Sequence, residues 1–436
     1  MNGQKNRRIK MIQSFKKINS VNGTLTFQGD KSISHRALLI SSLAKGKSVI
    51  KNLSGSDDVK STLSCLNALG IETDFKDEVC EVCGNGFKGY KKPSAHLFAG
   101  NSGTTVRLLS GILAAQKFET VIEGDESLSK RPMKRVIDPL KLMGAKIEGD
   151  DTGRLPLQIF PSAKLKAINY NMPVASAQVK SVVLLTGLHL KEQTSVIETV
   201  PTRNHTENLL GLKIIKENNQ IISTVSSVNY PEPKEYFIQG DISSAMYFIV
   251  LALLTKNSEL IVKNVSLNPT RIECLNILKR MGGNVQIEEK GISNNEIFGD
   301  VIVKSSDLRN VKISEEVVPL IIDEIPILTI AGIFADGNFE LRGASELRVK
   351  ESDRINSVCR NLLKTGLLVE EYEDGFRVDG KLRNITEPFE SYNDHRIAMA
   401  FAILSSLSEE GEKVNGFEYV SVSNPDFLKQ LNLIAC

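Results

Sequence analysis

The sequence contains a long internal repeat. Phe27-Gln-Gly-Asp-Lys-Ser returns as Ile238-Gln-Gly-Asp-Ile-Ser, and each copy is followed by an apolar run. After that run, Ser48-Val-Ile-Lys-Asn-Leu-Ser54 returns as Glu259-Leu-Ile-Val-Lys-Asn-Val-Ser266. A self-similar stretch of this length predicts that the chain folds into two structurally equivalent halves.

The two copies differ just after their shared Gly-Asp. The first copy has Lys31, His35 and Arg36 where the second copy has Ile242, Met246 and Tyr247. A charge that only the scaffold needs should occur in both copies. We therefore expect the basic residues of the first copy to serve a ligand.

Composition narrows the class of protein. The chain has 436 residues, of which 41% are apolar, which is too long for one ordinary core and suits two domains. The formal net charge is +2, and no stretch approaches the ~18 consecutive apolar residues of a membrane span. We therefore expect neither nucleic acid nor a membrane as a partner, although a local anion site is compatible with this charge. Scattered cysteines are typical of reduced thiols, so we expect a cytoplasmic α/β protein.

The repeat extends to six copies of one unit. Each copy opens with a small polar cluster, continues into an apolar stretch of helix length and then a short strand. The openings are Gly29-Asp-Lys-Ser, Gly100-Asn-Ser-Gly-Thr, Val174-Ala-Ser-Ala-Gln, Gly240-Asp-Ile-Ser-Ser, Asp323-Glu-Ile-Pro and Asp394-His-Arg. Most copies add a second helix that ends at glycine and a β-hairpin, such as Lys146 to Ile159. The predicted unit is βαβαββ or a close permutation.

The sixth copy ends near Cys436, too early to include its own hairpin. The N-terminal segment from Phe15 to Phe27, turning at Asn22-Gly23, has the pattern of the missing hairpin. We therefore expect the N-terminus to complete the last unit. The predicted domains are residues 30–239, and residues 1–29 together with 240–436, with a hinge near Gly29 and Gly240.

Basic residues recur near the starts of the predicted helices. Helix N-termini present free N–H groups and partial positive charge, which favour anions. A solvated surface charge is the commoner interpretation of any one arginine, but the shared position favours a positively charged cleft between the halves. The residues concerned are Lys31, Arg36, Arg131, Arg203, Lys350, Arg354 and Arg396.

Several of these motifs are distinctive in combination and in order. They are Gly29-Asp-Lys-Ser-Ile-Ser-His-Arg36, Gly100-Asn-Ser-Gly-Thr-Thr105, Arg131-Pro-Met, Val174-Ala-Ser-Ala-Gln-Val-Lys180, Asp323-Glu-Ile-Pro326, Leu347-Arg-Val-Lys-Glu-Ser-Asp-Arg354 and Asp394-His-Arg396. From about Gly23 to Phe427 the chain resembles the EPSP synthases, the 3-phosphoshikimate 1-carboxyvinyltransferases. The resemblance implies an inside-out α/β barrel-like fold of two domains, each with three repeated units. It also implies transfer of the enolpyruvyl group of phosphoenolpyruvate to the 5-hydroxyl of shikimate 3-phosphate, with release of phosphate.

The resemblance also implies roles for individual residues. Shikimate 3-phosphate would be bound by Lys31, Ser32, Arg36, Ser176, Gln178, Arg203, Asp323 and Lys350. Phosphoenolpyruvate would be bound by Lys31, Gly103, Arg131, Gln178, Arg354 and Arg396. Asp323 would be the base near the 5-hydroxyl, and Glu351 the proton donor and acceptor at the methylene, with Lys31 as a partner. Taken alone, Asp323 is equally well interpreted as the cap of the helix that leads into Pro326.

Three positions depart from the family pattern. Gln28 replaces a proline, and Ala177 stands where some members have a second serine. The segment Val422-Ser-Asn-Pro425 has Asn424 in place of phenylalanine and lacks a lysine that some members use for phosphoenolpyruvate, which puts one contact with that substrate in doubt. Gly103 leaves room beside the phosphoenolpyruvate pocket, so we expect competitive inhibition by glyphosate, although Leu108 in the same helix weakens this expectation.

Other interpretations of the sequence are less favoured. Gly84-Asn-Gly-Phe-Lys-Gly89 resembles a dinucleotide-binding loop, but it leads to Tyr90-Lys-Lys-Pro93 rather than to a helix. Cys80-Glu-Val-Cys83 lacks the second pair of a zinc site, so we expect no metal and no cofactor. The sister enzyme that uses UDP-N-acetylglucosamine has Lys-Asn where this chain has Lys31-Ser32, and it has a loop cysteine that is absent between Cys83 and Cys274. A non-catalytic binder of phosphorylated metabolites would not need Asp323 and Glu351. The default oligomeric state is a monomer.

Overall fold

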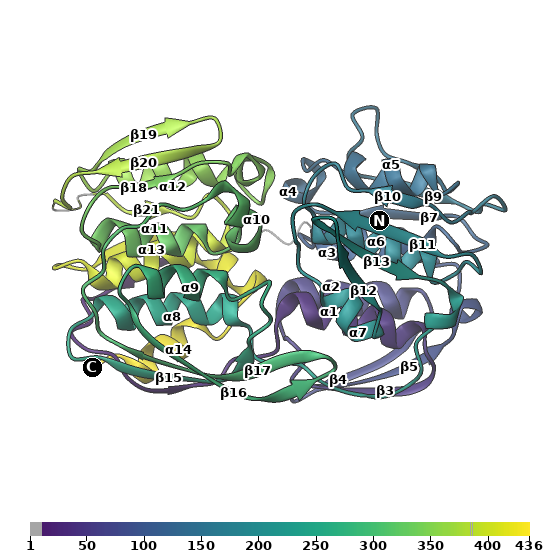
Figure 1. Cartoon of the computed structure of the whole chain (residues 1–436), viewed down its shortest axis with the longest axis horizontal. Helices are drawn as coiled ribbons and strands as arrows, with labels where there is room; N and C mark the ends of the chain where they lie inside the picture. The colour runs from purple at the N-terminus through teal and green to yellow at the C-terminus, as the bar shows by residue number, and fades with distance from the viewer. Residues whose placement is uncertain (1–10, 384, 386) are drawn as a thin grey trace.

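The structure is a computed structural model that describes residues 11–383, 385 and 387–436. Residues 1–10, which we assigned to the second domain, lie outside this range. Two lobes lie side by side, and each has its own apolar core (Figure 1). One core contains buried residues between Ile33 and Ile238, and the other contains residues between Phe15 and Phe27 and between Ile242 and Ile434. We call these parts the first half and the second half.

Within the described residues each half contains three small sheets, and the three sheets of the first half share one topology. The second unit illustrates this topology. Its elements are β6 (Leu97–Phe98), α3 (Gly103–Leu113), β7 (Thr120–Glu123), α4 (Glu126–Ser129), α5 (Lys134–Leu142), β8 (Lys146–Glu148) and β9 (Leu157–Phe160). Its first two strands, β6 and β7, pair in parallel, and the hairpin formed by β8 and β9 adds to β7 in antiparallel orientation. The order across the sheet is β6-β7-β9-β8. The βαβαββ prediction is confirmed for this unit.

The other two sheets of the first half follow the same plan. The first unit contains β14 (Glu235–Phe237), α1 (Lys31–Leu43), β3 (Lys45–Lys51), α2 (Asp57–Ala68), β4 (Glu72–Lys76) and β5 (Val79–Asn85). The third unit contains β10 (Asn169–Asn171), α6 (Ala177–Gly187), β11 (Thr194–Glu198), α7 (His205–Leu210), β12 (Ile214–Glu217) and β13 (Gln220–Val225). Because β14 comes from the end of this half, the last strand of the half completes its first sheet.

The second half repeats the plan with variations. Its first unit contains β2 (Asn22–Leu25), α8 (Ile242–Leu254), β15 (Glu259–Ser266), α9 (Glu273–Arg280), β16 (Asn284–Ser293) and β17 (Glu296–Lys304). The next contains α10 (Val318–Ile321), α11 (Ile325–Phe334), β18 (Phe339–Leu341), α12 (Arg354–Leu363), β19 (Leu368–Tyr372) and β20 (Gly375–Asp379). The last contains β21 (Phe389–Glu390), α13 (His395–Leu407), β22 (Glu412–Asn415), α14 (Phe427–Ile434) and β1 (Ile12–Phe15).

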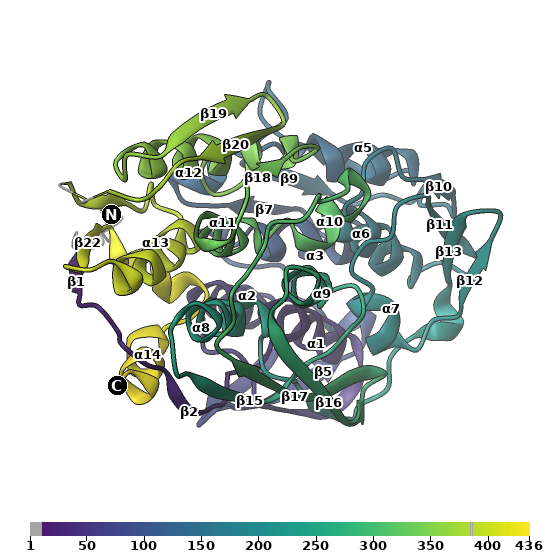
Figure 2. The same cartoon turned by 60° about the vertical axis from the view of Figure 1, so that its left-hand side comes forward.

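The N-terminal segment differs from the predicted hairpin. β1 pairs antiparallel with β22 and completes the last sheet, as expected. β2, however, pairs in parallel with β15 in the fourth sheet, so the hairpin with a turn at Asn22-Gly23 is wrong (Figure 2). The physical reason is burial: pairing with β15 places Leu25 in the core of the second half, where it is 1% exposed. One N-terminal segment therefore supplies strands to two different sheets.

The six polar openings lie at the starts of six buried helices, as predicted. These helices are α1, α3, α6, α8, α11 and α13. The glycines that were expected to end the second helices have positive φ angles, which is the left-handed conformation of a helix C-terminus. They are Gly70, Gly144, Gly211, Gly282 and Gly366.

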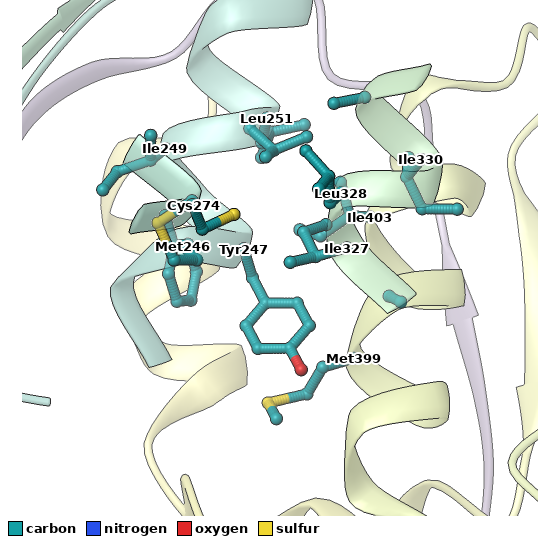
Figure 3. Packing of buried hydrophobic residues seen from close by; sticks show 14 of the residues in the cluster. Met246, Tyr247, Ile249, Leu251, Cys274, Ile327, Leu328, Ile330, Met399 and Ile403 are labelled. Atoms are coloured by element: carbon teal, nitrogen blue, oxygen red, sulfur yellow. The ribbon is translucent and has the colours of Figure 1, made fainter. Parts of the chain in front are cut away.

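The difference between the two copies of the repeat has a structural counterpart. In the second half, α8, α11 and α13 pack together, and Tyr247 lies among Met246, Ile327 and Met399 (Figure 3). In the first half, the equivalent Arg36 is also buried, but it contacts hydroxyl groups rather than an apolar core. The halves share a scaffold and differ in the surroundings of these equivalent residues.

The chain passes between the halves at two adjacent points. Gly29 and Gly240 form an antiparallel bridge, the Asp30 N–H donates to the Gln239 carbonyl (2.7 Å), and the Asp241 N–H donates to the Gln28 carbonyl (3.0 Å). A Cβ atom on Gly29 would lie 2.0 Å from a backbone oxygen, so only glycine fits there. The domain boundaries that we proposed fall at this paired crossing.

Candidate active site

Arg354 connects the acidic residues of the site. It is the first residue of α12 and is 1% exposed, and Asp353 caps the helix by accepting from the Asn356 N–H (3.0 Å). Its guanidinium donates to Asp394 Oδ2 (2.8 Å), to Asp323 Oδ1 (3.3 Å) and to a carboxylate oxygen of Glu351. One arginine thereby brings together the two carboxylates that the sequence singled out.

Asp323 is held by arginines from both halves. Arg203, which lies in the loop before α7, donates to Oδ2 (2.5 Å), and Arg396 at the start of α13 donates to the Asp323 carbonyl (2.8 Å). Burial tends to raise the pKa of the Asp323 carboxyl, but Arg396, Arg203, Lys350 and Arg354 outweigh it and hold the pKa well below the usual value. The carboxylate is therefore ionised and able to accept a proton.

Glu351 lies where the second half meets the first. Arg131, near the start of α5, donates to its Oε1 (3.4 Å), and the Ser127 hydroxyl donates to its carbonyl (3.3 Å). Burial would raise the pKa of the Glu351 carboxyl, yet the charges of Arg354, Arg131 and Lys31 hold it well below the usual value. Burial lowers the pKa of the neighbouring His395 imidazole well below its usual value, so this ring is neutral.

Lys31 begins α1, whose N-terminus is capped by Asp30 through the Ile33 N–H (3.0 Å). Its ammonium forms an ion pair with Asp58 (2.8 Å). Its charge also helps to hold the pKa of Glu351 below the usual value. Its direct partner in this structure is nevertheless Asp58, a residue that no sequence motif had marked.

Arg36 and Ser32 lie one turn apart on α1. The Arg36 guanidinium donates to the Thr206 hydroxyl (2.8 Å), the Ser181 hydroxyl (2.8 Å) and the Ser32 carbonyl (2.9 Å). Burial lowers the pKa of Arg36 to about 10. Ser181 lies on α6, whose N-cap Ser176 accepts from the Val179 N–H (3.4 Å). The start of α6 and the first turns of α1 therefore lie next to each other.

Gln178 connects α6 to α3. Its side chain donates to the Thr104 hydroxyl (2.9 Å) and accepts from Arg107 (2.8 Å). Burial lowers the pKa of the Arg107 guanidinium to about 9. A Cβ on Gly103 would lie 2.7 Å from an Arg107 nitrogen. Sequence reasoning missed Arg107, although its position four residues after Gly103 puts both on one helix face.

Eight cations lie in or near this region, interspersed with carboxylates. Burial lowers the pKa of the Lys350 amine, which forms no hydrogen bond or ion pair with any residue that the structure describes. The cations are Lys31, Arg36, Arg107, Arg131, Arg203, Lys350, Arg354 and Arg396, and the carboxylates around them are Asp58, Asp323, Glu324, Glu351 and Asp394. Such a site suits ligands that carry several negative charges.

Two of the family departures have identified contacts. The Gln28 amide donates to Asp426 in the second half (3.0 Å) and accepts from the Gly55 N–H in the first half (2.8 Å). Asn424 is buried and donates to Gln430 on α14 (2.8 Å). Gln28 thus joins the two halves, which a proline side chain could not do.

The weaker sequence motifs behave as local structure. The Gly84–Gly89 segment leaves β5 and forms a single 3₁₀ turn (Phe87–Gly89) rather than a helix. Within the described ranges, no group of three or more His, Cys, Asp or Glu residues is arranged to hold a metal ion. In the same part of the chain, no single helix is long and apolar enough to span a membrane; the pair Glu315–Ile321 and Ile325–Phe334 meets the criterion only when combined, across a 116° bend.

Comparisons with known proteins agree with this geometry. Residues 15–431 match the family model described as EPSP synthase (3-phosphoshikimate 1-carboxyvinyltransferase). The chain is 47% identical over 417 residues to the 3-phosphoshikimate 1-carboxyvinyltransferase of Petrotoga mobilis, covering 94% of this chain and 96% of that protein. It is 41% identical over 429 residues to the Salinibacter ruber protein of the same name, covering 98% and 100%.

Solved structures give the same result. The EPSP synthase of Acinetobacter baumannii superposes with a TM-score of 0.84 at 38% identity, covering 98% of each chain. The enolpyruvyl transferase NikO from Streptomyces tendae, at 14% identity and a TM-score of 0.69, shares the fold, with 98% of this chain and 97% of that chain covered. The chain belongs to the EPSP synthase (3-phosphoshikimate 1-carboxyvinyltransferase) family.

Proposed function

We propose that the charged region between the halves is the site at which the enolpyruvyl group of phosphoenolpyruvate is transferred to the 5-hydroxyl of shikimate 3-phosphate. The observation that carries this proposal is the placement of two ionised carboxylates, Asp323 and Glu351, on one buried arginine among clustered cations. Both substrates carry a phosphate and a carboxylate, so the cluster of arginines and lysines matches them. Family membership supplies the reaction, which belongs to the shikimate pathway of aromatic biosynthesis.

Shikimate 3-phosphate is assigned to the first half and to the Asp323 side of the site. The phosphate is bound by Ser176 and Gln178 at the start of α6, where free N–H groups favour an anion. Lys31, Ser32, Arg36, Arg203 and Lys350 complete this set. Arg36 and Arg203 suit a carboxylate or phosphate because the guanidinium can donate two parallel hydrogen bonds.

Phosphoenolpyruvate is assigned to the Glu351 side, where cations from both halves converge. Arg131 belongs to the first half, whereas Arg354 and Arg396 belong to the second. Gly103, Gln178 and Lys31 line the same region. Ligand binding would thus be strongest when the halves are together, because only then do all three arginines act on one molecule.

The two carboxylates divide the proton transfers. Asp323 removes the proton from the 5-hydroxyl of shikimate 3-phosphate while the hydroxyl oxygen attacks C2 of phosphoenolpyruvate. The methylene carbon of phosphoenolpyruvate is protonated in the same addition. Glu351 is assigned that second transfer, for which its carboxylate must first take up a proton. Binding of the phosphate and carboxylate of phosphoenolpyruvate offsets the surrounding arginines and favours this uptake, and Glu351 then passes the proton to the methylene carbon, with Lys31 and the neutral His395 beside it. In the elimination, a methyl proton returns to Glu351 while the C–O bond to phosphate breaks, which restores the double bond and releases phosphate.

The test is phosphate release on mixing the protein with phosphoenolpyruvate and a second substrate. Release with shikimate 3-phosphate, and none with UDP-N-acetylglucosamine, is the expected result. Release with the UDP-sugar alone would identify the sister reaction. Binding of both substrates without phosphate release would indicate a protein that binds but does not catalyse.

Three finer properties belong to the same proposal. The protein acts as a monomer, because one chain contributes every residue assigned to the site, and it acts in the cytoplasm, where its six free cysteines stay reduced. Glyphosate, a phosphonate with a carboxylate, competes with phosphoenolpyruvate beside Gly103. Light scattering during gel filtration and inhibition kinetics at varied phosphoenolpyruvate test the first and the last of these properties.

A further inference from the structure

Arg271 is a buried arginine that has no part in the roles assigned above. It lies in the loop between β15 and α9, and its side chain is 2% exposed. One terminal nitrogen lies 3.5 Å from Asp30 Oδ2 and 3.7 Å from Asp241 Oδ1, and the other lies 3.3 Å from Glu324 Oε1. A guanidinium among three buried carboxylates compensates charges that would be costly to leave unpaired.

Two of these carboxylates belong to the crossing between the halves. Asp30 and Asp241 are equivalent residues of the internal repeat, and each caps a helix. Asp30 accepts from the Ile33 N–H (3.0 Å) at the start of α1, and Asp241 accepts from the Ser243 N–H (2.8 Å) at the start of α8. Arg271 therefore fixes the starts of α1 and α8 relative to each other. Asp30, through which it holds α1, directly precedes Lys31.

The third carboxylate leads to Asp323. Glu324 accepts a hydrogen bond from the Ser243 hydroxyl, which in turn accepts from Arg396 Nη1 (2.7 Å). The same Arg396 nitrogen donates to the Asp323 carbonyl (2.8 Å). An uninterrupted series of contacts thus runs from Arg271 to the backbone of Asp323.

We propose that Arg271 is a positioning residue for the reaction. Through Glu324, Ser243 and Arg396 it sets where Asp323 lies, and through Asp30 it sets where α1 presents Lys31. The proposal rests on the role assigned to Asp323 under the proposed function. Because none of the three carboxylates that Arg271 contacts is itself assigned to a substrate, its loss should affect turnover more than binding.

The experiment compares Arg271→Met and Arg271→Lys with the wild-type protein. Titration calorimetry with shikimate 3-phosphate gives the dissociation constant and the fraction of binding-competent sites, and phosphate release gives kcat per competent site. For Arg271→Met we expect kcat per site to fall on the order of 10- to 100-fold, with a dissociation constant within about threefold of wild type, because misplacement by about 1 Å is enough to slow a reaction. Arg271→Lys keeps the charge but cannot reach three carboxylates at once, so it should recover the competent fraction and only part of kcat.

The matched control is Arg280→Met at the end of α9, whose half-exposed guanidinium lies 3.7 Å from Glu273. It should leave both quantities unchanged. Wild-type kcat per site in Arg271→Met, or full recovery in Arg271→Lys, would show that charge compensation is the whole role and would overturn the proposal. If Arg271→Met has no binding-competent sites, kcat per competent site of Arg271→Lys alone decides between positioning and charge compensation. An inactive wild-type protein would contradict the proposed function instead, before any variant is compared.

Discussion

Replacing Lys180 with methionine should strongly destabilise the first half. The Lys180 ammonium lies 2.8 Å from Glu198 at the end of β11 and 2.8 Å from Glu207 on α7, and all three side chains are at most 2% exposed. It also donates to the Thr202 carbonyl (3.4 Å), within the loop that carries Arg203. One lysine therefore fixes both ends and the middle of that loop.

The magnitude follows from this burial. Removing one partner of a buried ion pair typically costs about 3–5 kcal/mol, because the other charge is left uncompensated. For a cooperative unit of about 200 residues, each kcal/mol lowers Tm by about 2–4 °C, so the expected decrease is roughly 6–20 °C. Scanning calorimetry measures it. Lys47→Met is the control, because its ion pair with Glu81 is exposed and its loss should leave Tm nearly unchanged.

The effect should also depend on pH. Burial already raises the pKa of the Glu198 carboxyl, and loss of Lys180 should raise it further. A carboxyl whose pKa is higher in the folded than in the unfolded protein destabilises the fold only above its unfolded pKa, which is about 4.3 for glutamate. The loss of stability grows as the pH rises and becomes constant once the pH exceeds the folded pKa. The decrease in Tm should therefore be larger at pH 8 than at pH 5. A small decrease, or one that is equal at both pH values, would refute the charge argument.

Three other changes test the site and the crossing. Asp323→Asn should keep shikimate 3-phosphate binding but lower kcat by about 10²–10⁴-fold, because the general base is lost; near-normal turnover would contradict its role. Gln28→Ala should lower the free energy of unfolding by about 1–2 kcal/mol in denaturant titrations, because the charge-assisted bond to Asp426 is removed; an unchanged midpoint would show that this bond contributes little. Gly103→Ala should displace Arg107, which raises the KM for phosphoenolpyruvate and weakens inhibition by glyphosate. A millimolar inhibition constant of glyphosate for the wild-type protein would argue against the predicted sensitivity.

The repeated scaffold was predictable from sequence because each unit encodes it locally. A capping residue, an apolar helix and a closing glycine occur in nearly every unit, so helix starts such as those of α1 and α8 could be located without tertiary information. The destination of β2 could not be found this way. Asn22-Gly23 has the composition of a hairpin turn, but the pairing of a short strand is decided by the distant edge that buries it, here β15.

Some residues of the site could likewise be predicted from the sequence, and others could not. Residues inside the recognisable motifs, such as Asp323 and Glu351, could be named because their order along the chain carries information. Arg107 required a helical-face argument that the sequence permits. Arg271 gave no signal at all, because its three partners come from three different units and become neighbours only once the halves are assembled.

The divided N-terminal segment has a consequence for the order of synthesis. β1 leaves the ribosome before the other described elements, yet its partner β22 follows roughly 400 residues later. At about 5–20 residues per second, β1 waits about 20–80 s for that partner. The first half can fold in the meantime, since all its strands lie between β3 and β14. During translation the second half thus folds late, and its strand β1 stays unpaired until then. In that state the nascent chain can bind chaperones or pair with other chains.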